Sequence, residues 1–97
     1  MYREQVIDKL RQNESTLRAR GVVHVALIGS LARQEPTAHD IDILVEFDPA
    51  ARVTVFDYAG IKDYIAGLFE GPVDVVDREA LKPRVRETSV QDAVYAF

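Results

Sequence analysis

The chain has 97 residues, of which 47% are hydrophobic and 29% charged, and its formal net charge is −4. These values indicate one globular domain, residues 1–97, and exclude a basic protein that would bind nucleic acid directly through general charge attraction. The absence of cysteine excludes disulfide scaffolds and cysteine-based zinc sites, and no apolar run has the length of a membrane span. No signal-peptide pattern is visible, so we expect a soluble, cytoplasmic protein without membrane contact.

The first third of the chain predicts a helix followed by a buried strand. Apolar residues recur at helical spacing from Tyr2 to Arg20, and Gly21 stands where a helix commonly ends. The segment VVHVALI, Val22 to Ile28, is almost wholly apolar and rich in β-branched residues, which favours a central strand. A short helix within 30–35 and a turn at Pro36–Thr37 are expected next.

Two further strands and two helices are predicted after this turn. The segment DIDILVEF, Asp40 to Phe47, alternates apolar and polar residues as a strand with one buried face does. Thr54 and Asp57 form a capping box that opens a helix through about Phe69. A third strand, VDVV (73–76), and a helix from Pro83 to about Ala96 complete the chain. The residues expected on the apolar face of the middle helix are Val55, Tyr58, Ile61, Ile65, Leu68 and Phe69.

This order of elements predicts an α/β (α+β) fold in which flanking helices cover at least one face of a small mixed sheet. The second and third strands are expected to be parallel, because a helix connects them. The short link between the first and second strands is compatible with either direction.

The spacing of Asp40 and Asp42 places two carboxylates on one face of the second strand, about 6.5–7 Å apart at Cα. Two such charges repel each other unless water solvates both or a cation lies between them. Carboxylate oxygens suit Mg²⁺, which prefers them to nitrogen or sulfur ligands. A solvent-facing edge strand with an acidic side would produce the same spacing, so the pair alone leaves both interpretations open.

Two other features favour a phosphate-handling site. Gly29 and Ser30 stand where the buried strand ends, and a glycine there lets the backbone approach a ligand closely. The N–H groups of a following helix and the Ser30 hydroxyl can bind phosphate, although Gly-Ser can also be an ordinary turn with a serine cap. Asp74 stands among valines in the third strand and completes a carboxylate triad if that strand neighbours the second. Three carboxylates beside a phosphate-binding turn describe a metal-dependent phosphoryl-transfer or nucleotidyl-transfer site.

The sequence Gly29-Ser30, nine residues and then Asp-Ile-Asp-Ile resembles the signature of the DNA polymerase β-like nucleotidyltransferase superfamily. Within it, the segments GSLAR, DIDILVEF and the tail from Val73 to Tyr95 are similar to the minimal nucleotidyltransferase (MNT) antitoxins, which are paired with HEPN ribonuclease toxins. This chain departs from the family in three respects. The connection has nine residues rather than about ten, Gln34 replaces a usual glycine, and His39 replaces a serine that is frequent before the first aspartate.

The resemblance implies roles for individual residues. Gly29 and Ser30 would hold the triphosphate of ATP, and Asp40 and Asp42 would bind two Mg²⁺ ions. Asp74 would be a third metal ligand that also helps to deprotonate the attacking hydroxyl. Arg33 either balances triphosphate charge or is a solvated helix residue. The acceptor would be a hydroxyl, expected to be that of a tyrosine, on a cognate HEPN toxin that forms a hetero-oligomer with this chain.

Two alternatives remain open at this point. The protein could neutralise a toxin by masking it without catalysis, or it could modify a small molecule as aminoglycoside nucleotidyltransferases do. Other polar residues near the motifs receive mainly structural interpretations. These are a surface role for Glu46, a core or edge position for His24 and a loop hydrogen bond for His39. For Lys82, Arg84 and Arg86 they are a solvated face or, alternatively, contact with an acidic partner or with the nucleotide.

Overall fold

The computed structural model describes residues 2–35 and 40–97. The turn predicted at Pro36–Thr37 and the hydrogen bond predicted for His39 lie outside these residues. No helix in the described parts of the chain has the length and apolarity that a membrane crossing requires. The elements in chain order are α1 (Arg3–Gln12), α2 (Glu14–Ala19), β1 (Val22–Ile28), α3 (Gly29–Ala32), β2 (Ile41–Phe47), α4 (Val55–Ala66), β3 (Val73–Asp77), the 3-10 helix η1 (Arg78–Ala80), α5 (Pro83–Gln91) and β4 (Val94–Tyr95).

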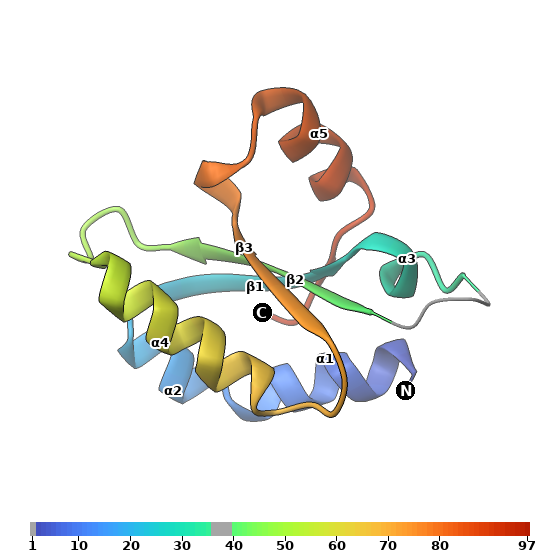
Figure 1. The fold of residues 1–97 in the computed structure, drawn as a ribbon, viewed down its shortest axis with the longest axis horizontal. Helices are drawn as coiled ribbons and strands as arrows, with labels where there is room; N and C mark the ends of the chain where they lie inside the picture. The colour runs from blue at the N-terminus through green and yellow to red at the C-terminus, as the bar shows by residue number, and fades with distance from the viewer. Residues whose placement is uncertain (1, 36–39) are drawn as a thin grey trace.

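The strands form one mixed sheet in the order β3-β2-β1-β4. In Figure 1 the edge strand β3 is drawn in front of β2 and β1. β1 runs antiparallel to both β2 and β4, whereas β2 and β3 are parallel and connected through α4. The predicted mixed α/β architecture and the parallel pairing of the second and third strands are therefore confirmed. The register places Asp42 opposite Ile28 of β1 on one side and opposite Asp74 of β3 on the other.

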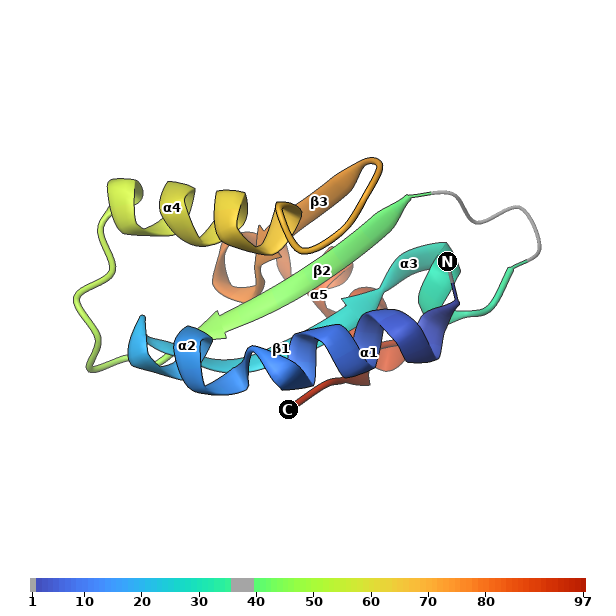
Figure 2. The ribbon, with the colours of Figure 1, turned by 90° about the horizontal axis from the view of Figure 1, so that it is seen from below.

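Helices cover the two faces of the sheet unequally. Helices α1, α2 and α4 lie together along one face, as Figure 2 shows from below. Their apolar residues, such as Leu10, Leu17 and Ile61, pack with the inward residues of the strands, among them Leu27 and Ile43. The opposite face carries α5, which covers only a small apolar cluster built on Ala26, Ile28 and Leu44, with Val76, Leu81, Val90 and Ala93 packed against it. The side chains of β2 that share this face are polar on both sides of Leu44 because the strand alternates.

The predicted first helix is wrong in one respect, because it is divided at Asn13 into α1 and α2. The Asn13 side-chain amide donates to the Lys9 carbonyl at 2.8 Å and accepts a hydrogen bond from the Tyr64 hydroxyl of α4. Asparagine competes with the helix for backbone partners, which favours a helix end at this position. The break still leaves Leu10 and Leu17 fully buried in the same core.

The predicted last helix is also wrong at its end. Helix α5 stops at Gln91, and Val94–Tyr95 then pair with Leu27 and Ala26 as the edge strand β4. The chain end is fixed further by Arg11 of α1, whose Nε donates to the carbonyl of Ala96 at 2.8 Å. This hydrogen bond joins the C-terminal residues to the first helix.

The middle helix begins at the predicted capping box but ends at Ala66, earlier than predicted. Of its predicted apolar face, Ile61 and Ile65 are fully buried, and Tyr58 and Phe69 pack partly against the core. Val55 is an exception, since 79% of its surface is exposed. It precedes the point at which α4 lies over the sheet, so it has no core to contact.

Candidate active site

The end of β1 brings Gly29 directly against the carboxylate of Asp42. Gly29 has φ +76°, in the left-handed region that favours glycine. A Cβ atom built at this position would lie 2.6 Å from Oδ2 of Asp42, closer than any stable contact allows. Both the backbone angle and the space therefore require glycine here, and the requirement comes from the carboxylate itself.

Helix α3 follows at once and ends in a Schellman motif. Its closing hydrogen bonds run from Gln34 N to Leu31 O at 3.1 Å and from Glu35 N to Ser30 O at 3.0 Å. Gln34 has φ +58° and is the non-glycine residue with positive φ in the described chain. Gln34 thus keeps the backbone conformation for which glycine, the usual residue of the family loop, is suited.

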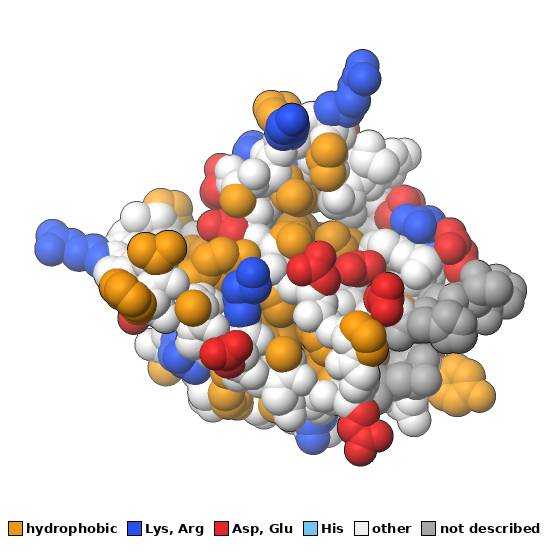
Figure 3. Space-filling view, in the orientation of Figure 1, with side chains coloured by type: hydrophobic (Ala, Val, Ile, Leu, Met, Phe, Trp, Pro, Cys, Tyr) orange, Lys and Arg blue, Asp and Glu red, His pale blue; other side chains and the backbone are white. Residues whose placement is uncertain are grey.

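The carboxylates of β2 and β3 lie side by side because the two strands are parallel and in register at Asp42 and Asp74. Burial raises the pKa of Asp42 above its ordinary value, and the nearby charges of Asp74 and Asp40 raise it further. The Arg33 guanidinium opposes this by lowering the pKa of Asp42. Asp42 is half-buried, while Asp40 and Asp74 are exposed. Figure 3 shows acidic side chains gathered on the face of the molecule beside α3 and the strands.

These acids supply the oxygen donors that Mg²⁺ prefers, and their mutual repulsion is the condition that a divalent cation relieves. In residues 2–35 and 40–97, no three His, Cys, Asp or Glu side chains already form a group that could hold a metal ion. The acids are therefore neighbours rather than an assembled three-ligand centre. Metal binding by Asp40, Asp42 and Asp74 stays a prediction.

Arg33 and Ser30 occupy the two ends of α3. The guanidinium of Arg33 forms ion pairs with Glu35 at 2.9 Å and with Asp92, at the end of α5, at 3.6 Å. The hydrogen bond and charge of Glu35, followed by the charge of Asp92, raise the pKa of Arg33. Ser30 is half-buried in the first turn, where helix N–H groups have no intrahelical partner. Nucleotide binding by Gly29, Ser30 and Arg33 remains a prediction on this geometry.

The polar residues expected to be structural have structural partners. Glu46 lies 3.7 Å from Nε of Arg78 and accepts a hydrogen bond from Tyr95 at 3.5 Å, as expected for a surface role. Arg86 donates to three carbonyls, those of Arg78, Glu79 and Leu81, and so fixes the turn around η1. His24 differs from the expectation, because it is exposed on the central strand β1 and lies neither in the core nor on an edge strand.

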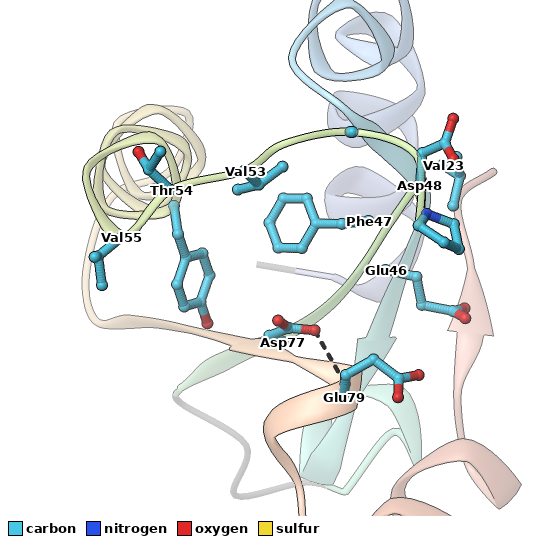
Figure 4. A pocket seen from close by; sticks show the side chains of 12 residues that line it. Val23, Glu46, Phe47, Asp48, Val53, Thr54, Val55, Asp77 and Glu79 are labelled. Atoms are coloured by element: carbon cyan, nitrogen blue, oxygen red, sulfur yellow. Dashed lines mark hydrogen bonds between the residues drawn. The ribbon is translucent and has the colours of Figure 1, made fainter.

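A feature that the sequence patterns did not indicate lies at the other end of β2. A cavity of about 720 Å³ opens between the end of that strand, the start of α4 and η1. Figure 4 shows Phe47 and Val53 pointing into it, with the carboxylates of Glu46, Asp77 and Glu79 along one side. Its lining comes from separate segments, so no local motif marks it.

Comparison with known proteins identifies relatives along nearly the whole chain. The family model described as a nucleotidyltransferase domain matches residues 3–96. A candidate protein adenylyltransferase of Methanocaldococcus jannaschii is 30% identical over 94 residues, which are 94% of each chain. The protein adenylyltransferase MntA of Thermococcus cleftensis is 29% identical over 94 residues, covering 95% of this chain and 93% of that protein.

Solved structures show the same fold. A candidate minimal nucleotidyltransferase is 33% identical, with a TM-score of 0.78 and coverage of 97% of this chain and 95% of that one. A toxin–antitoxin structure with AMP-PNP has a TM-score of 0.71 at 19% identity, covering 94% of this chain and 72% of the other. A tri-AMPylated HEPN toxin of Shewanella oneidensis in complex with its MNT antitoxin gives a TM-score of 0.61 at 20% identity, covering 91% and 70%.

The last two likenesses, at 19% and 20% identity, concern the fold alone. The family match and the two relatives at 30% and 33% identity each cover at least 94% of the chain they match, so the relationship extends beyond a shared local motif. The chain therefore belongs to the nucleotidyltransferase domain family of enzymes and is one of its minimal members.

Proposed function

We propose that this protein is an antitoxin that transfers AMP from ATP to a hydroxyl group of a partner toxin, a ribonuclease of the HEPN class. The observation that carries the proposal is the contact of Gly29 with Asp42, in a strand whose neighbour presents Asp74 at the same level. It combines a backbone turn free of side chain with a pair of carboxylates. The relatives named as protein adenylyltransferases, and the AMPylated toxin in a complex of the same fold, support the choice of reaction and partner.

The metal cofactor in this proposal is Mg²⁺. Its ligands would be Asp42, Asp74 and Asp40, the residue that directly precedes β2. When bound, it would neutralise phosphate charge and lower the pKa of the acceptor hydroxyl. The chain's own residues would position the nucleotide. The missing Cβ of Gly29 leaves the space in which the Asp42 carboxylate lies against the end of β1. The Ser30 hydroxyl and the free N–H groups of α3 would donate to the phosphate oxygens of the nucleotide.

The reaction balances as a single displacement. The acceptor oxygen attacks the α-phosphorus of ATP, its bond to that phosphorus forms, and the bond from phosphorus to the pyrophosphate oxygen breaks. The hydroxyl proton passes to Asp74, which is exposed and therefore able to return it to water. The products are an AMP ester of the acceptor and pyrophosphate. Positioning and charge neutralisation supply the rate enhancement, without a covalent enzyme intermediate.

A protein acceptor is favoured by the relatives of this chain. The described helices and strands form the sheet, the layers on it and the candidate site. Two relatives that are named as protein adenylyltransferases support a folded protein as the acceptor. We propose tyrosine as the acceptor residue, on a complex that buries about 800 Å² per partner.

The direct test is to incubate the protein with ATP, Mg²⁺ and the toxin encoded by the neighbouring open reading frame, and then to measure both intact masses. We expect the toxin to gain the mass of one or more AMP groups. Asp42→Asn and Asp74→Asn should abolish the gain, whereas Asp63→Asn, which changes an exposed carboxylate of α4, should not. A toxin that gains no mass with any nucleotide refutes the transferase proposal.

The same variants separate modification from masking in cells. If Asp42→Asn/Asp74→Asn protects cells from the toxin as well as the wild type does at equal expression, binding alone neutralises the toxin. Loss of protection with retained binding identifies catalysis as the protective step.

A further inference from the structure

The cavity at the end of β2 combines an apolar floor with an acidic rim. The rings of Phe47 and Tyr58 meet edge to face with their centres 5.7 Å apart, and Val53 lies beside them. The volume of about 720 Å³ is enough for several side chains of another molecule. Such a floor, open to solvent, favours an apolar occupant.

The rim carries four carboxylates, and no Lys or Arg belongs to the described lining. Two of them, Glu46 and Glu79, are partly neutralised by Arg78, at 3.7 Å and 3.4 Å. The other two, Asp48 and Asp77, accept hydrogen bonds from the backbone N–H groups of Ala50 and Glu79. Within residues 2–35 and 40–97, neither Asp48 nor Asp77 has a cation at ion-pair distance, which leaves uncompensated negative charge at the mouth.

The rim continues into two exposed apolar side chains at the start of α4. Val55, which lines the cavity, is 79% exposed, and Phe56 is 87% exposed. The reciprocal hydrogen bonds of the capping box, Asp57 N to Thr54 Oγ1 at 3.1 Å and Thr54 N to Asp57 Oδ2 at 3.0 Å, fix this turn. Both side chains are thus displayed on a rigid backbone, which lowers the entropic cost of contact with a partner. Figure 3 shows apolar side chains gathered over the start of α4.

We propose that this surface docks the partner protein through a segment that carries a large apolar side chain with Arg or Lys beside it. We call it the docking cavity and define it by Phe47, Asp48, Val55, Phe56 and Asp77. The apolar side chain would fill the floor, and the basic groups would pair with Asp48 and Asp77. The same charges disfavour nucleic acid or an anionic membrane as occupant, since both present phosphate.

The position of the docking cavity fits a protein that also reaches the acidic site, and to this extent the inference rests on the proposed function. Phe47 follows Asp42 by five residues in the same strand, a separation of roughly 17 Å. An interface of about 800 Å² per partner extends over such a distance. Figure 3 shows the apolar surface at the start of α4 and the acidic side chains beside α3 on one face of the molecule.

The test measures binding separately from catalysis. Isothermal titration calorimetry gives the Kd for the toxin of the neighbouring open reading frame, and mass spectrometry gives the KM for that toxin and kcat. We expect Val55→Ser/Phe56→Ser and Asp48→Asn/Asp77→Asn each to raise Kd and KM at least tenfold, with kcat at saturating toxin within about twofold of the wild type. The control Val85→Ser removes an apolar side chain that is 48% exposed on α5 and should change neither constant.

Salt provides a second measurement that does not depend on the apolar variants. Raising the ionic strength from about 0.05 M to about 0.5 M should weaken binding of the wild type more than binding of Asp48→Asn/Asp77→Asn. Circular dichroism melting identifies any variant that fails to fold. If Val55→Ser/Phe56→Ser fails, the salt dependence decides, and if Asp48→Asn/Asp77→Asn fails, the Kd of Val55→Ser/Phe56→Ser decides.

Each outcome has a definite meaning. Unchanged Kd values in both double variants, or no binding of the wild type to the toxin, overturn the proposal that the docking cavity binds the partner. Variants that alter the sedimentation of the protein alone assign the surface to a second copy and overturn it as well. A toxin that binds through this surface without gaining mass leaves the docking cavity standing and refutes the proposed transferase instead.

Discussion

Gly29 and Asp42 are in contact so close that a methyl group on the glycine would lie 2.6 Å from Oδ2 of the carboxylate. Gly29 directly follows β1, whose last residue, Ile28, pairs with Asp42 of the antiparallel strand β2. The Asp42 carboxylate can therefore lie against the end of β1 only because residue 29 has no side chain.

Gly29→Ala should reduce nucleotidyl transfer at least a hundredfold, because its Cβ would displace the Asp42 carboxylate from its place in the candidate site. Gly71→Ala is a matched control, since Gly71 also has positive φ (+86°) but a methyl group there would meet no other described residue within 4 Å. Both variants should lose about 1 kcal/mol of folding free energy from backbone strain. Equal loss of activity in the two would show that strain, and not the contact with Asp42, is responsible.

Asp42→Asn should stabilise the protein in the absence of metal. Burial and the charges of Asp74 and Asp40 raise the pKa of Asp42 in the folded state, so the unfolded chain loses this proton first as the pH rises. The stability of the wild type therefore falls as the pH increases from the unfolded pKa of about 3.9 through the raised folded pKa, and the full cost is present above it.

The corresponding measurement is the melting temperature of both proteins between about pH 3.5 and pH 7.5 with a chelator present. The advantage of Asp42→Asn should grow across the lower part of this range and then become constant. Asp63→Asn should show no such growth. An advantage that shrinks as the pH rises would contradict the direction of the pKa shift.

Gln34→Gly should raise the free energy of unfolding by about 0.5–1 kcal/mol, because Gln34 holds φ +58° at the glycine position of a Schellman motif. Urea denaturation of both proteins measures the difference. Gln34→Ala, which keeps a Cβ at the same angle, should bring no gain. Transfer activity should be retained in Gln34→Gly, since the backbone conformation is unchanged.

Mg²⁺ together with a non-hydrolysable ATP analogue should raise the melting temperature of the wild type. Ligands at a hundredfold excess over their Kd stabilise a folded protein by about 2.7 kcal/mol. Asp42→Asn/Asp74→Asn should lose most of this stabilisation. For the wild type, the analogue without Mg²⁺ should stabilise less than the analogue with Mg²⁺. Scanning calorimetry measures the melting temperatures. An equal rise in the double variant would show that Asp42 and Asp74 do not bind the metal.

Arg86→Ala should destabilise the protein by about 1–3 kcal/mol, because three carbonyls around η1 lose their donor. Arg84→Ala, an exposed neighbour in the same helix, should change stability by less than about 0.5 kcal/mol. Urea denaturation compares the two. Similar losses of stability in the two variants would show that Arg86 is an ordinary solvated residue, as the sequence suggested.

Local patterns predicted the parts of the fold that local physics decides. The alternation in DIDILVEF predicted a strand, and the helix between it and VDVV favoured a parallel arrangement of the two strands, as observed. The sequence left open whether the third strand neighbours the second, and the observed pairing places Asp74 beside Asp42. Gln34 adopts the positive φ of a Schellman motif and keeps its hydrogen bonds, although glycine is the residue suited to that position. The sequence alone did not reveal this conformation.

The remaining features depend on contacts between distant residues. The break at Asn13 is held by Tyr64, and the ion pair of Arg33 involves Asp92 near the other end of the chain. The strand β4 has only two residues, too few for a periodic signal. Exposure of Val55 reflects where α4 begins relative to the sheet, which helical spacing does not encode.

The register between β1 and β2 has a consequence for how related chains can be recognised. Because Ile28 is paired with Asp42 by the strands themselves, the carboxylate keeps its place whatever the number of residues between Ser30 and Asp40. That connection can therefore change in length without a change in the pairing of β1 with β2. Distant homologues are therefore better aligned by the predicted pairing of the two strands than by a fixed interval between their motifs.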